Sequence, residues 1–499
     1  MSGRVPLIIA SLPARSVERA RIEAANARAA GADLAEVRLD RWPPSEQEEA
    51  SRLFPSPLPL VATYRSHAEG GEGEDDPTRR AERLRRFASL PFRWIDLERD
   101  RDLPLLGELP SPEMLGRIVS IHLASSTPEE WARRLRDLSE STAGVGKLVV
   151  RASVLDTFRE LLPRLPPPEE ATLVVHTVGP SGPLLRAFSR RLGFPFVFGS
   201  LPEADDRDPV EPSQVPVDRL RPFLASTDPA PLFAVTGRAV ARSRSPSLHA
   251  RWMRSERRSG LYVPLELATD EEFVLALPYL ASSGFRGINV THPFKPVAFE
   301  AATSAGKGAE ACGAANCLTF REGTIEAENT DLVAILRRLG ELRGQGRWDG
   351  RTLGVVGAGG SARATLAAAR TLSAEAIVYA RRHDAASDLA REFHARAGTV
   401  AEAGPLSLVV HATNAGRVGA DPLGVPLDRL VGPASHVIDW VYDATVPEVR
   451  GIAEAAGATY ENGWRLLVYQ AAESYALWWG NDLEPTTIAE TLREGECTA

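Results

Sequence analysis

The stretch "TLGVVGAGGSARATLAAA", residues 352–369, decides the fold of the second half of this 499-residue chain. It consists of an apolar run, a glycine-rich turn and a run of small residues, a succession that predicts a strand, a turn and a helix. Gly357, Gly359 and Ala362 match the pattern G-x-G-x-x-A of dinucleotide-binding domains. Glycines at these places let backbone N–H groups approach a pyrophosphate at the N-terminus of the helix. We therefore predict a Rossmann-type domain here.

The next apolar run, "EAIVYARRHD" (375–384), indicates which dinucleotide this domain takes. NAD sites place an acidic residue at the end of this strand to hold the ribose 2′-hydroxyl. This chain has Ala380, Arg381 and Arg382 there, and two arginines suit the extra 2′-phosphate of NADP(H). A solvated turn that happens to contain arginines is the alternative. We predict NADP(H) as the cofactor.

A lysine lies upstream in "GFRGINVTHPFKPVAF" (284–299), although only three of the 58 lysines and arginines in the chain are lysines. Lys295 lies in a proline-containing turn after an apolar strand, and Asp331 lies at a later junction of strand and loop. A lysine paired with an aspartate beside a nicotinamide can manage the proton at a carbonyl that is being reduced. The other polar residues at such junctions are Asn289, Thr291 and Asn316.

The first half of the chain repeats a different pattern, in which short apolar runs alternate with helix-like stretches. Repeated βα units predict a parallel sheet, and eight of them predict a (β/α)8 barrel. The proline-containing segment "ASTDPAPLFAVTG" (225–237) places the boundary between the halves near residue 229. The runs are 5–11, 34–40, 58–65, 92–98, 117–123, 145–151, 172–177 and 194–200.

Another of the three lysines, Lys147, interrupts the apolar run "VGKLVVR" (145–151). A desolvated ammonium can lose its proton and attack a ketone to form a Schiff base, which a guanidinium cannot do. A lysine at a strand end that extends its ammonium into solvent is the alternative. Polar residues also lie within or at the ends of neighbouring strands, where barrel enzymes place their chemistry, and this favours catalysis. They are Glu36, Arg38, Arg65, Asp96, Glu98 and His122.

These residue types suggest one reaction, the dehydration of a hydroxyketone. An iminium on Lys147 would withdraw electrons, His122 would remove a proton from the neighbouring carbon, and Glu69 would orient the imidazole. Loss of a β-hydroxyl would follow. Arg38, Arg65 and Arg186 could clamp a substrate carboxylate, although each could also be a solvated surface charge.

Composition excludes several classes of protein. A net charge of −8 argues against nucleic acid or an anionic membrane as the main partner, and we expect neither. We find no apolar run of membrane-spanning length and no signal or transit peptide before the first strand pattern. Cys312, Cys317 and Cys497 have neither metal-binding nor disulfide spacing, so we expect no metal and a reducing, cytoplasmic location.

Residues 5–224 resemble type I 3-dehydroquinate dehydratase through five ordered segments: "AEVRLD", "YRSHAEGG", "VSIH", "GKLVV" and "SQV". The resemblance implies that Lys147 is the Schiff-base lysine and that His122 and Glu69 are the acid/base pair. It implies that the substrate contacts Glu36, Arg38, Arg65, Arg186 and Gln214. The chain departs from the family at Leu123 and Ala124, which replace Asp-Phe, and at Val210, which replaces a serine and puts one substrate hydrogen bond in doubt.

Residues 231–495 resemble shikimate dehydrogenase through "SRSPSLH", "NVTHPFK", "GAANCL", "ENTD", "GAGGSARA", "HATNAG", "DWVY" and "NGWRLLVYQAA". The resemblance implies Lys295 and Asp331 as the catalytic pair. The implied substrate site consists of Ser243, Ser245, Asn289, Thr291, Asn316, Asp331, Tyr442 and Gln470. The implied cofactor site consists of Gly357, Ala358, Gly359, Gly360, Ser361, Arg381, Arg382, Thr413 and Gly463. Three family asparagines are replaced, by Ala250, Ala380 and His411.

Together the resemblances imply an α/β protein with three parts. A (β/α)8 barrel spans 1–228, a substrate domain spans 229–333 and is completed by 464–499, and a Rossmann NADP domain spans 334–463. The implied function is bifunctional: 3-dehydroquinate loses water to give 3-dehydroshikimate, which NADPH reduces to shikimate. A regulatory protein built from the same domains and a catabolic quinate dehydrogenase are the alternatives, and the sequence leaves homo-oligomerisation open.

Overall fold

The computed structural model describes residues 4–140, 144–168, 172–202, 210–227, 229–399, 401–415, 423–442 and 447–497. These residues fall into two compact units, one built mainly by residues 1–232 and the other mainly by residues 268–499. The sequence predicts a domain boundary between residues 228 and 229. Residue 228 lies outside the described residues. In the part of the chain that the structure describes, no helix combines the length and apolar character needed to cross a membrane.

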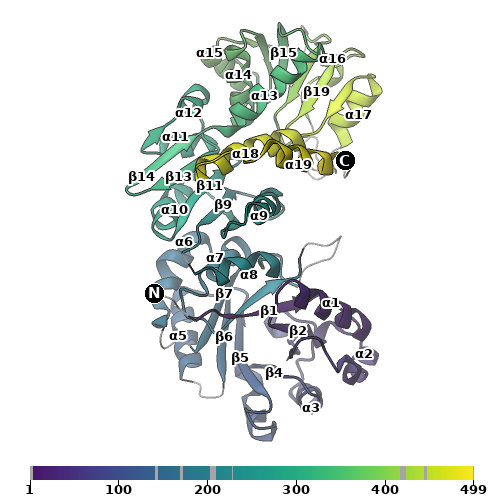
Figure 1. The fold of residues 1–499 in the computed structure, drawn as a ribbon, viewed down its shortest axis with the longest axis vertical. Helices are drawn as coiled ribbons and strands as arrows, with labels where there is room; N and C mark the ends of the chain where they lie inside the picture. The colour runs from purple at the N-terminus through teal and green to yellow at the C-terminus, as the bar shows by residue number, and fades with distance from the viewer. Residues whose placement is uncertain are drawn as a thin grey trace. The chain divides into compact units, whose positions relative to one another are not determined.

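The first unit is an eight-stranded sheet with the strand order β7-β6-β5-β4-β3-β2-β1-β8, and all its pairings are parallel (Figure 1). Each of the eight predicted strands is present, so the predicted barrel is confirmed. The strands are β1 Leu7–Leu12, β2 Leu34–Arg38, β3 Leu60–Thr63, β4 Trp94–Glu98, β5 Gly116–Leu123, β6 Val145–Arg151, β7 Leu173–Val178 and β8 Phe196–Ser200.

Apolar side chains from strands around the barrel meet in one buried cluster. Ile9, Leu34, Val61, Ile118 and Val174 belong to it and come from five different strands. Because side chains alternate along each strand, this cluster fills the interior below the strand ends. The helices of this unit are α1 Val17–Ala29, α2 Pro44–Glu48, α3 Pro77–Ala88, α4 Arg99–Asp102, α5 Pro128–Ser139, α6 Val154–Asp156, α7 Gly182–Phe188 and α8 Val217–Ala225.

Side chains bridge β7 and β8, the two strands at the ends of the strand order. The Phe198 backbone N–H donates to His176 Nε2 at 3.2 Å. Arg186 on α7 donates to the Phe198 carbonyl at 3.0 Å and to the Thr177 carbonyl at 2.9 Å. Backbone groups that would otherwise lack a strand partner are therefore satisfied by His176 and Arg186.

The second sheet has six strands in the order β10-β9-β11-β13-β14-β12. It is mixed, since β13 runs antiparallel to both β11 and β14. The strands are β9 Leu232–Gly237, β10 Leu261–Glu266, β11 Phe285–Val290, β12 Ser304–Ala305, β13 Cys317–Arg321 and β14 Thr324–Glu328. The helices that accompany it are α9 Ser245–Ser255, α10 Asp270–Ser282, α11 Lys295–Glu300 and α12 Lys307–Cys312.

The third sheet is parallel throughout, with the order β17-β16-β15-β18-β19-β20. In sequence order this is 3-2-1-4-5-6, the doubly wound order of dinucleotide-binding domains, which confirms the predicted Rossmann fold. The strands are β15 Thr352–Val356, β16 Glu375–Tyr379, β17 Arg396–Ala397, β18 Leu408–His411, β19 His436–Asp439 and β20 Thr459–Glu461. The helices are α13 Thr330–Gly344, α14 Gly360–Thr371, α15 His383–Phe393, α16 Leu427–Leu430, α17 Pro447–Ala455, α18 Trp464–Trp479 and α19 Pro485–Cys497.

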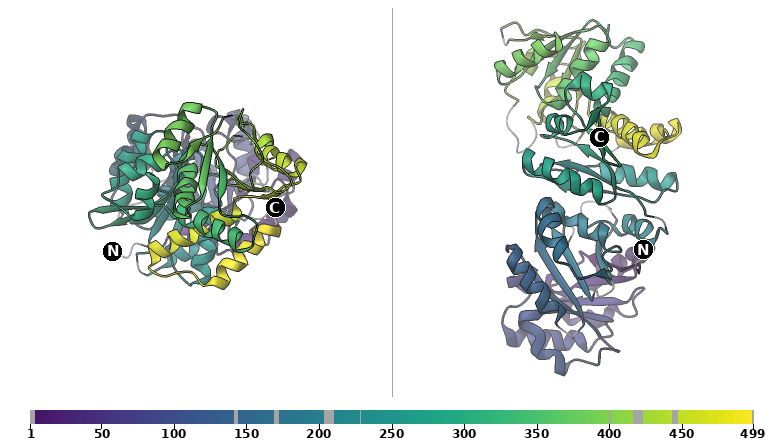
Figure 2. Two further views of the ribbon diagram at one scale, coloured as in Figure 1. Left: turned by 90° about the horizontal axis from the view of Figure 1, so that it is seen from above. Right: turned by 90° about the vertical axis from the view of Figure 1, so that its left-hand side faces the viewer.

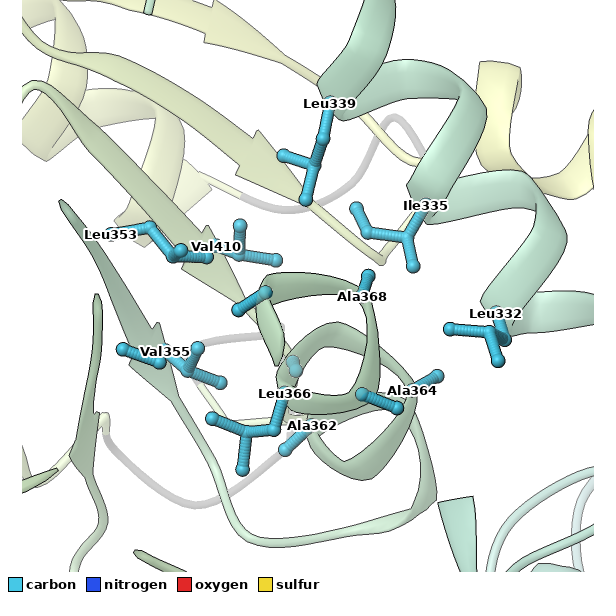
Figure 3. Close-up of a cluster of buried hydrophobic side chains, with 14 of the residues drawn as sticks. Leu332, Ile335, Leu339, Leu353, Val355, Ala362, Ala364, Leu366, Ala368 and Val410 are labelled. Atoms are coloured by element: carbon cyan, nitrogen blue, oxygen red, sulfur yellow. The ribbon is translucent and has the colours of Figure 1, made fainter. Parts of the chain in front are cut away.

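The core of this third sheet fixes the helix that carries Asp331. Ile335 and Leu339 of α13 lie in one buried cluster with Val355 of β15 and with small residues of α14 such as Ala364 (Figure 3). Small side chains on α14 allow α13 to pack closely against it. Helix α18 packs against α13 and α9, and α19 packs against α18 (Figures 1 and 2).

Candidate active sites

Lys147 lies in the middle of β6 and is 5% exposed, so the alternative of a lysine extended into solvent is wrong. Its Nζ lies 3.2 Å from Asp96 Oδ2 and 3.9 Å from Glu36 Oε1. The ammonium also lies 4.0 Å from the centre of the Phe198 ring. Lys147 is thus enclosed between two carboxylates and an aromatic face.

Asp96, on β4, was noted as a polar residue in an apolar strand, but no role was predicted for it. Besides Lys147, it accepts hydrogen bonds from Arg65 at 2.7 Å and from the Ser120 hydroxyl at 2.6 Å. Burial raises the pKa of Asp96, but Arg65 and Lys147 outweigh this and hold that pKa well below its usual range. Asp96 therefore stays ionised as the counter-charge to two buried cations. Its position inside an apolar strand was the signal in the sequence.

His122 and Glu69 are brought together as predicted. His122 Nδ1 lies 3.0 Å from Glu69 Oε2, and the His122 backbone N–H donates to the same oxygen at 3.2 Å. Burial and the cations Arg65 and Lys147 lower the pKa of His122 well below its ordinary value. Burial raises the pKa of Glu69 to about 7, even though Arg65 lies 3.0 Å away and lowers it. A neutral imidazole can take a proton from a substrate.

Glu36 and Gln214, the first and last of the substrate residues predicted for the barrel, are linked through Ser11. Glu36 accepts from Ser11 Oγ at 2.7 Å and from Thr63 Oγ1 at 2.9 Å. Gln214 Nε2 donates to Ser11 Oγ at 3.1 Å, while Gln214 Oε1 is buried and has no hydrogen-bond partner among the described residues. Ser11 and Thr63 were not among the predicted site residues.

The two remaining arginine candidates of the barrel differ in their partners. Arg38 is held by Asp40 through two hydrogen bonds of 2.9 and 2.7 Å. Arg186 is 2% exposed and donates to backbone carbonyls, with no carboxylate in ion-pair distance in the described parts of the chain. Burial lowers the pKa of Arg186 to about 10. A buried guanidinium without a carboxylate is suited to take one from a ligand.

Lys295 begins α11 and pairs with Asp331 in the first turn of α13. The Nζ to Oδ2 distance is 2.6 Å, and both residues are buried. Nζ also donates to Ser361 Oγ at 3.3 Å, on the glycine-rich turn. At Gly360 a Cβ would lie 2.6 Å from Lys295 Cδ, so only glycine allows this approach. The lysine therefore joins the substrate domain to the predicted cofactor site.

Three amide side chains surround this lysine–aspartate pair. Asn316 Nδ2 donates to Asp331 Oδ1 at 2.9 Å and lies 3.4 Å from Gln470 Oε1. Asn289 Nδ2 donates to the Asn316 carbonyl at 3.2 Å and to Ser474 Oγ at 2.8 Å. Four of the predicted substrate residues thus form one network. Thr330 and Ser474 also belong to it, although the sequence did not reveal them.

Four other predicted substrate residues do not join this network directly. Ser245 begins α9, and its N–H donates to Ser243 Oγ at 3.3 Å. Thr291 follows β11, and Tyr442 follows β19. Among the residues that the structure describes, no hydrogen bond links these four side chains to Lys295.

The glycine-rich turn has the shape that a pyrophosphate cradle needs. Gly357 has a φ of +129°, and a Cβ there would lie 2.6 Å from the Ala412 carbonyl oxygen and 2.9 Å from Thr413 Cγ2. Gly359 caps the N-terminus of α14. These residues fit a dinucleotide phosphate, because backbone N–H groups and the helix N-terminus are left open to it.

Three further cofactor candidates follow strands of the third sheet. Arg381 and Arg382 follow β16 and are exposed. Gly463 caps α18, and a Cβ there would lie 2.3 Å from the Trp440 carbonyl oxygen. The described residues contain no group of three or more His, Cys, Asp or Glu side chains that could hold a metal ion.

Comparison with known proteins divides the chain in the same way. Residues 8–229 match the family described as type I 3-dehydroquinase, and residues 235–318 match the shikimate dehydrogenase substrate binding domain. The shikimate dehydrogenase (NADP(+)) of Acidiphilium cryptum is 36% identical over 258 residues, which cover 50% of this chain and 91% of that protein. The enzyme of the same name from Dinoroseobacter shibae is 34% identical over 282 residues, which cover 53% of this chain and 98% of that protein.

Another relative matches both halves of the chain. The chloroplastic bifunctional 3-dehydroquinate dehydratase/shikimate dehydrogenase of Arabidopsis thaliana is 25% identical over 500 residues, which cover 95% of this chain and 82% of that protein.

Proposed function

The chain belongs to the shikimate dehydrogenase family and carries a type I 3-dehydroquinase domain before it, and we propose on this premise that its two halves catalyse consecutive reactions. The barrel dehydrates 3-dehydroquinate to 3-dehydroshikimate. The second half reduces that product to shikimate with NADPH. The observation that carries the proposal is that each half buries a lysine against an aspartate where its substrate would react.

In the barrel, Lys147 Nζ attacks the substrate ketone and forms an iminium with loss of water. Neutral His122 removes a proton from the carbon next to the iminium, and Glu69 holds its Nδ1 so that Nε2 faces the substrate. The β-hydroxyl leaves as a second water, protonated by the same imidazole. Hydrolysis of the iminium frees the product and returns Lys147. Arg186 receives the substrate carboxylate, because no carboxylate of the described residues lies within ion-pair distance of this buried cation.

In the second half, NADPH supplies the hydride when it is bound. Lys295 gives a proton to the oxygen of the ketone as the hydride reaches its carbon, and Asp331 holds the ammonium in place at 2.6 Å. Asn289, Asn316 and Gln470 position the substrate hydroxyls. The turn from Gly357 to Ser361 cradles the pyrophosphate, and Arg381 and Arg382 bind the 2′-phosphate.

The remaining assignments complete this proposal. The barrel ends near residue 228, and the chain from 464 onward returns from the NADP domain to complete the substrate domain, which the packing of α18 against α9 supports. We place the enzyme in the cytoplasm, with small molecules as its partners. A regulatory protein without catalysis is not favoured, because Lys147, His122, Lys295 and Asp331 are all present and in contact with their partners.

The experiment is incubation of the purified chain with 3-dehydroquinate, first without and then with NADPH. Without cofactor, the enone absorbance of 3-dehydroshikimate should rise; NADPH should then be consumed as that absorbance falls and shikimate forms. Quinate with NADP+ in parallel separates the biosynthetic enzyme from a catabolic quinate dehydrogenase. No absorbance change under either condition, with a folded protein, would overturn the proposal.

A further inference from the structure

His411 is a buried imidazole beneath the predicted cofactor site. It is the last residue of β18, the strand next to the one that leads into the glycine-rich turn, and it lies opposite Val356 on one side and opposite Asp439 on the other. His411 and Asp439 are both 0% exposed.

Hydrogen bonds on both ring nitrogens define the tautomer of His411. Nδ1 lies 2.9 Å from Asp439 Oδ1, and Nε2 lies 3.1 Å from Thr413 Oγ1. A carboxylate can only accept, so Nδ1 carries a proton; when that is the ring's single proton, Nε2 accepts from the Thr413 hydroxyl.

Asp439 is itself fixed from two further directions. Its Oδ1 accepts from the Val441 N–H at 3.0 Å, and its Oδ2 accepts from the Tyr460 hydroxyl at 3.2 Å. Burial and Asp439 raise the pKa of Tyr460, so that hydroxyl keeps its proton and donates. The His411 ring, the Val441 N–H and the Tyr460 hydroxyl therefore all donate to Asp439, and these hydrogen bonds fix the orientation of the imidazole.

The Thr413 hydroxyl lies where this chain of hydrogen bonds reaches the cofactor turn. With the single ring proton on Nδ1, the Thr413 proton goes to His411, and one lone pair of the hydroxyl accepts from the Ala415 N–H at 2.8 Å. Thr413 also borders the turn directly, since a Cβ on Gly357 would lie 2.9 Å from Thr413 Cγ2. One lone pair of the hydroxyl is left for a ligand.

We propose that His411 is a positioning residue that turns the Thr413 hydroxyl into a hydrogen-bond acceptor toward the bound dinucleotide. Thr413 then receives an O–H or N–H of the ligand, such as a ribose hydroxyl or the carboxamide, and does not donate to a phosphate oxygen. The inference rests on the proposed function, because it names how one residue of the proposed NADPH site acts.

Matched variants of His411 separate its two contacts. In His411→Asn the amide lies near the former Nδ1 and keeps the Asp439 contact but cannot reach Thr413, whereas in His411→Gln the amide reaches the former Nε2. NADPH affinity, measured by fluorescence titration, should weaken about three- to tenfold in His411→Asn, the range for a single neutral hydrogen bond. His411→Gln should stay within about twofold of wild type. Thr413→Val should match His411→Asn, and the double variant should lose no more than Thr413→Val alone.

Kinetics and spectroscopy distinguish positioning from a merely structural role. The KM for NADPH should rise in His411→Asn while kcat at saturating NADPH stays within about twofold, and dehydration by the barrel serves as the control for folding. In wild-type protein with ¹⁵N-labelled histidine, the signals that His411→Asn removes should show a protonated Nδ1 and an unprotonated Nε2. This second measurement needs no variant to be active.

The possible outcomes distinguish failure of the proposed cofactor site from failure of the positioning role. If wild type does not bind NADPH, the proposed cofactor site is wrong and this inference falls with it. If wild type binds NADPH and both His411→Asn and Thr413→Val bind it as tightly as wild type does, the proposed function stands and the positioning role is overturned. A proton on Nε2 of the His411 ring would likewise overturn it, because Thr413 would then have to donate elsewhere.

Discussion

Both halves of the molecule bury a lysine beside an aspartate, but the two pairs are built differently. Asp96 divides its oxygens among Lys147, Arg65 and Ser120, and its contact with Lys147 is 3.2 Å long. Asp331 gives one oxygen to Lys295 at 2.6 Å and the other to Asn316. A lysine that must release its proton to attack a ketone suits a shared counter-ion, whereas a lysine that must donate a proton suits a dedicated one.

Replacing Lys147, the proposed nucleophile, with another cation should have the largest effect on activity. Lys147→Arg keeps the charge beside Asp96, but a guanidinium cannot form the iminium. We expect the kcat of dehydration to fall by roughly 10³-fold or more, the order of loss when an enzyme loses its nucleophile. NADPH-dependent reduction of 3-dehydroshikimate by the same protein is the control and should be unchanged. Substantial dehydration by this variant would show that Lys147 only binds substrate.

Removing either member of the Lys295–Asp331 pair tests the opposite role. Lys295→Met and Asp331→Asn should each lower the kcat of reduction by about 10²–10⁴-fold, the usual contribution of a general acid–base group. The KM for 3-dehydroshikimate should change far less. Because the two residues act as a unit, the double variant should lose much less than the product of the single losses. A fall in substrate affinity with kcat retained would make the pair a binding clamp.

The acid side of the pH profile of dehydration should depend on Glu69. Glu69 orients His122 best when ionised, and burial raises its pKa to about 7, so the fraction of ionised Glu69 falls as the pH falls through 7. We expect kcat/KM of dehydration to drop about tenfold per pH unit below that value. Glu69→Gln should lower activity and remove this limb of the profile. An unchanged limb would assign it to another group.

The same shift makes a prediction about stability. A carboxyl with a raised folded-state pKa binds its proton more tightly in the folded protein than in the unfolded chain. Its contribution to stability is therefore present below the ordinary pKa of 4.5 and is lost as the pH rises toward about 7. In Glu69→Gln, the free energy of unfolding of the barrel should depend less on pH across this window, which denaturant titrations can measure.

The smallest expected effect concerns the cofactor. Neutral replacements of both Arg381 and Arg382 should raise the KM for NADPH by about tenfold or more, because each charge-assisted hydrogen bond to a phosphate contributes about 1.5–3 kcal/mol. The KM for NADH should barely change, because NADH lacks the 2′-phosphate. Equal losses with both cofactors would show that these arginines do not read that phosphate.

Much of the fold could be predicted from local sequence patterns. The eight barrel strands and the glycine-rich turn could be predicted because apolar runs and glycine spacing are properties of short segments. The bridge between β7 and β8 could not be predicted. The roles of His176 and Arg186 depend on which backbone groups of these two strands lack a strand partner, and that is known only from the folded structure.

The candidate sites show the same division. Lys147, His122 and Lys295 stood out because they are rare or interrupt apolar strands. Ser11, Ser120 and Ser474 did not, because a serine in a strand or helix is ordinary until the fold places it beside a carboxylate or an amide. Asp96 lay between these cases, visible as a polar residue in a strand but without a role until Arg65 and Lys147 were seen to share it.

Covalent trapping tests the difference between the two lysines most directly. Borohydride added to the enzyme with 3-dehydroquinate should reduce the iminium, and mass spectrometry of peptides should find the ligand on Lys147 and none on Lys295. The same treatment of Lys147→Arg should leave the protein unmodified. An adduct on another residue, or no adduct with an enzyme that still dehydrates its substrate, would contradict the account.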